Sequence, residues 1–239
     1  MSENFIQKIN YHLQHLLKKQ GIHLSQKQLA MIAQHAETLM VWNRKINLTA
    51  IKDPFQIAEK HFYDSIMAGS FLSKEIISIA DIGSGGGFPG IPLKIIKPEI
   101  KLLMIDASQK KVNFLKHMIH LLELEGAEAV HIKLEPDNRT IKSELYEKKE
   151  LDRLNIHNQF DAVISRALTD MESLTEIALP FLKTGGRIYS MKAGKAKKEI
   201  TRTLKEKFKL KMQHYILPGE KADRYLIELM AELQGRTSG

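Results

Sequence analysis

The sequence predicts an α/β protein: a mostly parallel sheet that ends in a C-terminal antiparallel hairpin, with a helical N-terminal extension. From Ile76 onward, short apolar runs alternate with helical patterns, as in parallel sheets that are covered by helices on both faces. The last two runs, at about 211–217 and 224–231, are joined by too few residues for a crossover helix, so they are expected to pair antiparallel. Before Ile76 the apolar residues follow only helical spacing.

Residues 1–75 are predicted to form a helical segment that packs on the main domain. Apolar side chains recur on one helical face over residues 4–20. Ser25 and Gln28 have the spacing of a capping box, which predicts that a second helix begins there. An aspartate–proline pair at Asp53 predicts the cap and first turn of further helical segments.

Residues 76–239 are predicted to form the main domain. Its strand candidates are short apolar runs, and a polar surface excursion is expected at 137–158, between the third and fourth strands. The strands before the hairpin are predicted at 76–82, 101–106, 129–134, 160–165 and 186–192, and the helices at 90–96, 108–124, 170–183 and 194–208.

Composition excludes several classes of protein. The 239 residues include no cysteine, so disulfides, thiolate zinc sites, iron–sulfur clusters and methylation through a cysteine nucleophile are excluded, and we expect no metal. No apolar run reaches 18 residues and the N-terminus lacks a secretory apolar region, so we expect no membrane span and a cytoplasmic location. The net charge is +8, and ten Lys or Arg lie between Arg187 and Lys211 against two Glu, which indicates a polyanionic partner.

A glycine-dense turn follows the first predicted strand and is the most informative motif. Its spacing fits the dinucleotide fingerprint, with glycines at 85, 87 and 90. It also fits the acid-led glycine pattern of S-adenosylmethionine (AdoMet) methyltransferases, which begins at Asp81 and continues with Gly83, Gly85 and Gly87. Asp106 closes the next strand, where the ribose hydroxyls of either cofactor require a carboxylate.

Spacing does not choose between these cofactors, but the charge at Asp81 favours AdoMet. A carboxylate at the strand end would repel a pyrophosphate, whereas AdoMet carries an ammonium and a sulfonium group that favour nearby carboxylates. Two alternatives remain open at this point. One is an NAD-dependent oxidoreductase that uses the overlapping fingerprint, and the other is a non-catalytic RNA-binding protein.

Five motifs, spread from residue 39 to residue 167, share residues and spacing with one family. They are Leu39-x-x-Trp42-Asn43-x-x-Ile46-Asn47-Leu48-Thr49, His61-x-x-Asp64-Ser65, the Asp81–Pro92 turn, Asp106-Ala107-x-x-Lys110-Lys111-x-x-Phe114-Leu115 and Ile164-Ser165-Arg166-Ala167. With them, about residues 10–230 resemble the bacterial small-subunit ribosomal RNA guanine-N7 methyltransferases, long called glucose-inhibited division protein B.

The resemblance implies an AdoMet-dependent enzyme with a Rossmann-like methyltransferase sheet. Its implied target is N7 of a guanosine in the 530 loop of 16S rRNA, and its partner is 16S rRNA or the small ribosomal subunit; we expect a monomer. The residues implied to lie at the cofactor are Gly83 and Phe88 against AdoMet, Leu134 and Glu135 beside its adenine, Asp106 at its ribose, and Arg166 at the reactive end.

Guanine N7 carries an exposed lone pair, so its methylation requires positioning and no general base. Arg166 is the predicted positioning residue, and His61 is interpreted as a packing histidine. Phosphates of the RNA are expected to contact basic residues in two segments, namely Arg44 and Lys45 in the first, and Lys192, Lys195, Lys197, Lys198 and Arg202 in the second.

Overall fold

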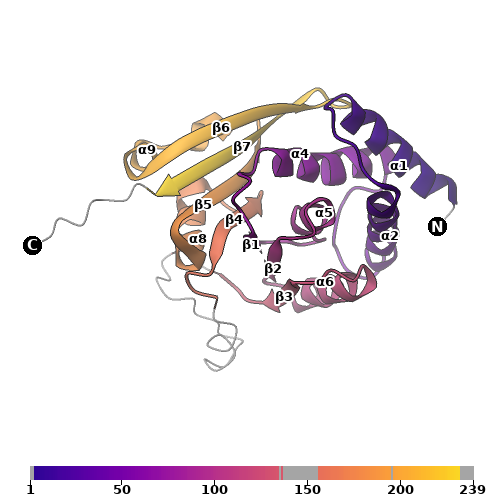
Figure 1. The fold of residues 1–239 in the computed structure, drawn as a ribbon, viewed down its shortest axis with the longest axis horizontal. Helices are drawn as coiled ribbons and strands as arrows, with labels where there is room; N and C mark the ends of the chain where they lie inside the picture. Colours follow the sequence, from indigo (N-terminus) through magenta and orange to yellow (C-terminus); the bar gives the residue numbers. More distant parts are fainter. Residues whose placement is uncertain (1–2, 135, 137–155, 195, 232–239) are drawn as a thin grey trace, which may run out of the picture.

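The computed structural model describes residues 3–134, 136, 156–194 and 196–231. Within them a seven-stranded sheet has the order β3-β2-β1-β4-β5-β7-β6 (Figure 1). Strands β1 to β5 pair in parallel, while β7 pairs antiparallel with both β5 and β6, which confirms the predicted terminal hairpin. The strands are β1 (Ser78–Ile82), β2 (Lys101–Asp106), β3 (Ala127–His131), β4 (Phe160–Arg166), β5 (Leu182–Ala193), β6 (Phe208–Leu217) and β7 (Ala222–Ala231).

Helices cover both faces of the sheet, so most strand residues are buried. One face carries the helices before β1 together with α5 and α6, and the other carries α8 and α9 (Figure 1). None of the described helices is long and apolar enough to cross a membrane. The helices are α1 (Glu3–Lys18), α2 (Gln26–Trp42), α3 (Pro54–Ile57), the π-helical turn η1 (Ala58–Tyr63), α4 (Asp64–Ser70), α5 (Gly90–Ile96), α6 (Gln109–Leu121), α8 (Met171–Ala178) and α9 (Arg202–Lys207).

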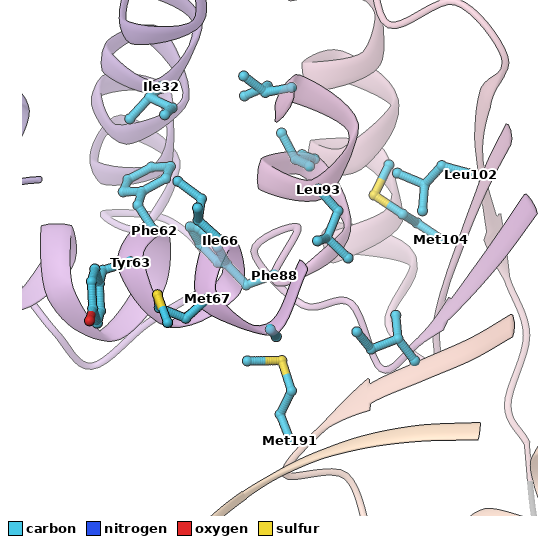
Figure 2. Close-up of a cluster of buried hydrophobic side chains, with 14 of the residues drawn as sticks. Ile32, Phe62, Tyr63, Ile66, Met67, Phe88, Leu93, Leu102, Met104 and Met191 are labelled. Carbon is cyan, nitrogen blue, oxygen red and sulfur yellow. The ribbon is translucent and has the colours of Figure 1, made fainter. Parts of the chain in front are cut away.

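The helical N-terminal segment and the sheet share one hydrophobic core. Figure 2 shows Ile32 of α2 and Phe62 of η1 in the same cluster as Phe88 of the glycine turn and Met191 of β5. Full burial of such a side chain contributes about 1.5–3 kcal/mol. The boundary near residue 75 therefore separates helices from strands without separating two cores.

The strand order places a topological switch point at β1. β1 pairs with β2 on one side and with β4 on the other, so the chain reverses its direction of progress across the sheet at β1. Open α/β sheets bind ligands outside the strand ends at such a switch point. The turn after β1 and the segment after β4 both begin at this edge, because Ile82 lies opposite Ser165 in the register.

Several element boundaries differ from prediction; the fifth and sixth strands begin four and about three residues earlier than predicted, and three other differences have a local reason. The third strand is shifted to Ala127–His131, because pairing with β2 begins directly after the turn at Gly126. The helix predicted at 170–183 ends at Ala178, and a 3-10 turn that contains proline follows it. The helix predicted at 194–208 is interrupted, because Thr201 caps a new helix by accepting from the Leu204 amide. Most of the expected excursion, residues 137–155, lies outside the described residues.

Candidate active site

The glycine turn leaves β1 through backbone conformations that require glycine. Gly83 has φ +78° and Gly85 has φ +56°, both in the left-handed region that disfavours a Cβ. The Gly83 amide donates to the carbonyl of Ile105 at 2.8 Å, so the turn is tied to the neighbouring strand β2. The backbone of the turn is thereby held at the carboxyl edge of the sheet.

Asp81 joins the end of β1 to the start of α5. Its carboxylate is fully buried, and Oδ2 accepts the Gly90 amide at 2.9 Å. A Cβ at Gly90 would lie 2.7 Å from that oxygen, so only glycine permits this approach. Burial raises the pKa of Asp81 to about 7, while the Gly90 hydrogen bond opposes the shift. The second oxygen, Oδ1, is buried without a hydrogen-bond partner.

Asp106 lies beside the turn, at the end of β2. Oδ2 accepts the Gly85 amide and Oδ1 accepts the Ser108 amide, both at 2.9 Å. A carboxylate offers about four lone-pair sites, so two remain for hydroxyl donors. These free sites and the orphaned Oδ1 of Asp81 suit the ribose hydroxyls and the positive charge of AdoMet, and the residues of the turn fit this cofactor.

Phe88 lies behind the turn, in contrast to the expected contact with AdoMet. Only 3% of its side chain is exposed, because the ring is stacked on His35 and on His61, with centroid distances of 4.7 and 4.6 Å. Nε2 of His35 is also 2.8 Å from the carbonyl oxygen of Gly86. Phe88 therefore supports the turn from within the core.

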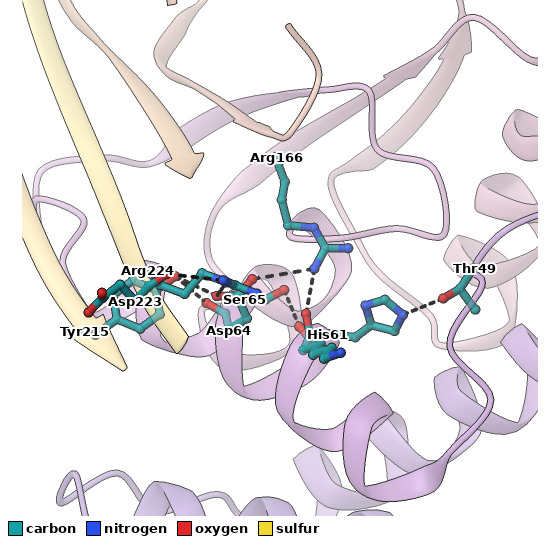
Figure 3. Close-up of polar contacts among 9 residues, drawn as sticks. Thr49, His61, Asp64, Ser65, Arg166, Tyr215, Asp223 and Arg224 are labelled. Atoms are coloured by element: carbon teal, nitrogen blue, oxygen red, sulfur yellow. Dashed lines mark hydrogen bonds and ion pairs between the residues drawn. The ribbon is translucent and has the colours of Figure 1, made fainter. Parts of the chain in front are cut away.

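The two histidines are packing residues, as predicted for His61. Burial lowers the pKa of His35 to about 4 and that of His61 to about 3, and the nearby Arg166 charge also disfavours a charged His61. Nε2 of His61 and the hydroxyl of Thr49 share a hydrogen bond of 2.8 Å (Figure 3). Both rings are consequently neutral at physiological pH.

Arg166 ends β4 and reaches over the N-terminal helices. Nη1 donates to the Lys60 carbonyl at 2.9 Å and lies 3.8 Å from Oδ2 of Asp64 (Figure 3). Its Cζ is 5.2 Å from the centroid of the Phe88 ring, and 22% of the side chain remains exposed. The guanidinium is thus fixed beside the turn with several N–H donors still available.

Asp64 is the centre of a buried polar cluster that the sequence did not predict. Its Oδ1 accepts the Tyr215 hydroxyl at 2.8 Å and lies 3.7 Å from Nε of Arg224, while Oδ2 faces Arg166 (Figure 3). The cluster connects α4 to β4 and to both hairpin strands. The motif His61-x-x-Asp64-Ser65 contains this aspartate, but only the fold shows its partners.

The remaining adenine-side residues are only partly described. Leu134 is half-buried and packs against the core on the α8 face, close to where Ile132 donates its amide to the Asp106 carbonyl. Glu135 lies outside the described residues. Within the described ranges, no three His, Asp or Glu side chains are grouped to hold a metal ion.

The basic residues expected at RNA are divided by the fold. Arg44, Lys45, Lys197 and Lys198 are exposed, and the Arg202 side chain is 91% exposed beside Glu206. Lys192 differs from the expectation, because it is only 9% exposed and is paired inside the protein. Lys195 lies outside the described residues.

Comparison with known proteins identifies the family. The family model described as rRNA small subunit methyltransferase G matches residues 28–227. The ribosomal RNA small subunit methyltransferase G of a Bacillus cereus strain is 39% identical over 188 residues, which are 78% of this chain and 73% of that protein. The protein of the same name in Bacillus cytotoxicus is 38% identical over the same shares of the two chains.

Solved structures of other methyltransferases share the fold. A predicted O-methyltransferase from Agrobacterium tumefaciens aligns with a TM-score of 0.52 and 17% identity over 72% of this chain and 81% of its own. A SAM-dependent methyltransferase from Aquifex aeolicus aligns with a TM-score of 0.51 and 14% identity over 83% of this chain and 98% of its own. The predicted Rossmann-like methyltransferase sheet is therefore confirmed.

These findings decide between the alternatives that the glycine spacing left open. The protein is an enzyme that methylates rRNA, and its cofactor is AdoMet in place of the alternative NAD. The acid-led turn, the Asp106 carboxylate and the sheet order agree with that chemistry. The chain belongs to the rRNA small subunit methyltransferase G family.

Proposed function

We propose that this enzyme transfers the methyl group of AdoMet to N7 of a guanosine in the 530 loop of 16S rRNA. The supporting observation is that three titratable side chains of the described site, His61, Asp64 and Asp81, are engaged or enclosed, so none of the three is available as a general base. His61 is neutral, buried and bonded to Thr49, Asp64 is paired with Tyr215 and two arginines, and Asp81 is enclosed behind the turn. Guanine N7 suits such a site, because its lone pair attacks without prior loss of a proton.

Arg166 is proposed to position the reacting groups. AdoMet supplies an electrophilic methyl carbon attached to a sulfonium. The guanidinium of Arg166 is held by Lys60 and Asp64, and its free donors are available for guanine O6 or for the AdoMet carboxylate. A donor aimed at N7 itself would occupy the attacking lone pair. Alignment of this kind contributes up to ~7–11 kcal/mol to lowering the barrier.

The proposed cofactor contacts follow the carboxyl edge of the sheet. Asp106 accepts the ribose hydroxyls with its two free lone-pair sites, and Gly83 and Gly85 let the cofactor approach the backbone of the turn. The buried Oδ1 of Asp81 provides negative charge beneath the cofactor. Leu134 and Glu135 flank the adenine in this proposal, and Phe88 holds the turn from behind.

The exposed basic residues are proposed to contact rRNA phosphates. Substitution of Lys197 and Lys198 by glutamine should weaken RNA binding and flatten its salt dependence by roughly 0.7–0.9 in log–log slope for each lost phosphate contact. Fluorescence anisotropy with an RNA of the 530 region, at several salt concentrations, measures both effects. AdoMet affinity serves as the internal control and should not change; an unaltered slope would remove this assignment.

The substrate is proposed to be 16S rRNA or the small subunit, bound by a monomer in the cytoplasm, where ribosomal subunits are assembled. The direct test compares 16S rRNA from cells with and without this protein. Borohydride reduction and aniline cleavage, followed by primer extension, locate 7-methylguanosine. One 7-methylguanosine signal in the 530 loop should disappear when the gene is deleted and return when the wild-type protein is supplied. It should not return when a folded Arg166→Ala variant is supplied. Loss of a methyl group at another nucleotide would refute the proposed target.

A further inference from the structure

Lys192 occupies an internal position that calls for a role other than contact with RNA. It lies near the end of β5, one residue after the position that pairs with Arg166 of β4. Its Nζ donates to the carbonyl of Thr169 at 2.5 Å and forms an ion pair of 2.7 Å with Glu199. A lysine that is 9% exposed is costly unless its charge is paired, so these two contacts account for its burial.

The carbonyl that Lys192 binds belongs to the segment that follows β4. Ala167 begins this segment with φ +52°, a left-handed conformation that is uncommon for a residue with a Cβ. At the other end, Asp170 caps α8 by accepting the Ser173 amide at 2.9 Å. Thr169 lies between these two ends, and Lys192 fixes its position relative to the sheet.

Leu168 is the residue of this segment that meets the glycine turn. A Cβ placed on Gly83 would lie 2.8 Å from Cδ1 of Leu168, so the leucine side chain packs directly on the Gly83 backbone. Nevertheless 44% of Leu168 is exposed. Ligand sites are lined mainly by apolar side chains, and Leu168 offers a partly exposed apolar surface beside the turn.

We infer that Leu168 forms a wall of the AdoMet site beside Gly83, and that Lys192 is a positioning residue that holds this wall in place through Thr169. The inference rests on AdoMet as the cofactor and not on the identity of the methylated nucleotide. Lys192 was expected to contact RNA phosphates; here it acts inside the protein, through Thr169 and Glu199. It follows Met191, the residue of β5 that pairs with Arg166.

Calorimetric titration of the full chain with AdoMet, without RNA, tests the wall. Leu168→Ala should raise the Kd for AdoMet at least fivefold with little change in thermal stability, because the side chain is half exposed. Leu168→Met keeps an apolar side chain of similar reach and should bind AdoMet within twofold of the wild type. An AdoMet affinity of Leu168→Ala equal to that of the wild type would overturn the inference.

The positioning role of Lys192 is tested by Lys192→Met with Lys198→Met as the matched control. Lys192→Met should weaken AdoMet binding at least fivefold and leave the salt dependence of RNA binding unchanged. Lys198→Met should leave AdoMet binding unchanged and reduce the salt dependence of RNA binding. A double variant that combines Lys192→Met with Leu168→Ala should bind AdoMet no more weakly than the weaker-binding single variant, because both substitutions disrupt the same wall. If the losses of AdoMet binding free energy in the double variant were fully additive, the positioning role of Lys192 would be overturned. The same conclusion would follow if Lys192→Met bound AdoMet normally but showed a reduced salt dependence of RNA binding. The Leu168 variants keep the wall testable if Lys192→Met does not fold.

Discussion

Replacement of Asp106 by asparagine gives the sharpest test of the cofactor site. Asp106 uses one lone-pair site of each oxygen on the backbone, at Gly85 and Ser108, and is proposed to use the remaining two on ribose. Asn has nearly the same shape but no charge, and its amide nitrogen cannot accept a hydrogen bond. The substitution therefore removes at least one charge-assisted ribose contact while it leaves one oxygen for the backbone.

A hydrogen bond to a charged group contributes about 1.5–3 kcal/mol. Loss of one such bond corresponds to a roughly 10-fold to 150-fold rise in the Kd for AdoMet. Isothermal titration calorimetry measures this change, and urea unfolding measures the accompanying cost in stability, since one of the two backbone contacts is also lost. The expected result is weaker AdoMet binding by at least tenfold in a variant that remains folded.

Asp161→Asn is the matched control for this experiment. Asp161 also accepts backbone amides next to β1, from Ile77 at 3.1 Å and Ser78 at 2.9 Å, but it lies at the opposite, amino-terminal edge of the sheet. Its substitution should lower stability and leave the AdoMet affinity unchanged. If Asp106→Asn bound AdoMet within twofold of the wild type, the proposed ribose contact would be refuted.

Three further predictions concern charge inside the site. Because burial raises the pKa of Asp81 to about 7, AdoMet affinity should rise between pH 6 and pH 8 more steeply in the wild type than in Asp81→Asn; parallel calorimetric profiles would contradict this. His35 and His61 have folded-state pKa values of about 4 and 3, below the ordinary 6.5, so they stabilise the fold above pH 6.5, and this stability is lost progressively as the pH falls from 6.5 to about 4 for His35 and to about 3 for His61. Together they should add at most about 2.7 kcal/mol per pH unit to the slope of the unfolding free energy against pH, measured by urea unfolding. His35→Gln should reduce this slope, and an unchanged slope would argue against a neutral buried His35. Asp64→Asn leaves two arginines and the Tyr215 hydroxyl without their carboxylate, which should cost about 3–5 kcal/mol and lower Tm by roughly 6–20 °C in calorimetry; a drop below about 2 °C would show that the cluster is not stabilising.

Features that depend on short stretches of chain were predictable. The capping box was predicted from Ser25 and Gln28, and the structure shows both reciprocal hydrogen bonds. The positive φ angles of Gly83 and Gly85 follow from glycine chemistry, and the alternation of strand and helix patterns predicted the parallel sheet. In each case the interacting groups lie within a few residues of one another or repeat with a fixed period.

Partners from distant parts of the chain could be assigned only from the tertiary structure. The position of β7 between β5 and β6, the stacking of Phe88 between His35 and His61, and the burial of Lys192 against Thr169 are not encoded in any local spacing. The charge run that contains Lys192 predicts a basic surface, but whether a given lysine faces solvent or an internal carboxylate depends on how the strands and the segments after them pack. The sequence determines which chemical groups are present at each strand end. Packing determines which of those groups come into contact, because these contacts join residues far apart in the chain, at sequence separations that follow no regular spacing.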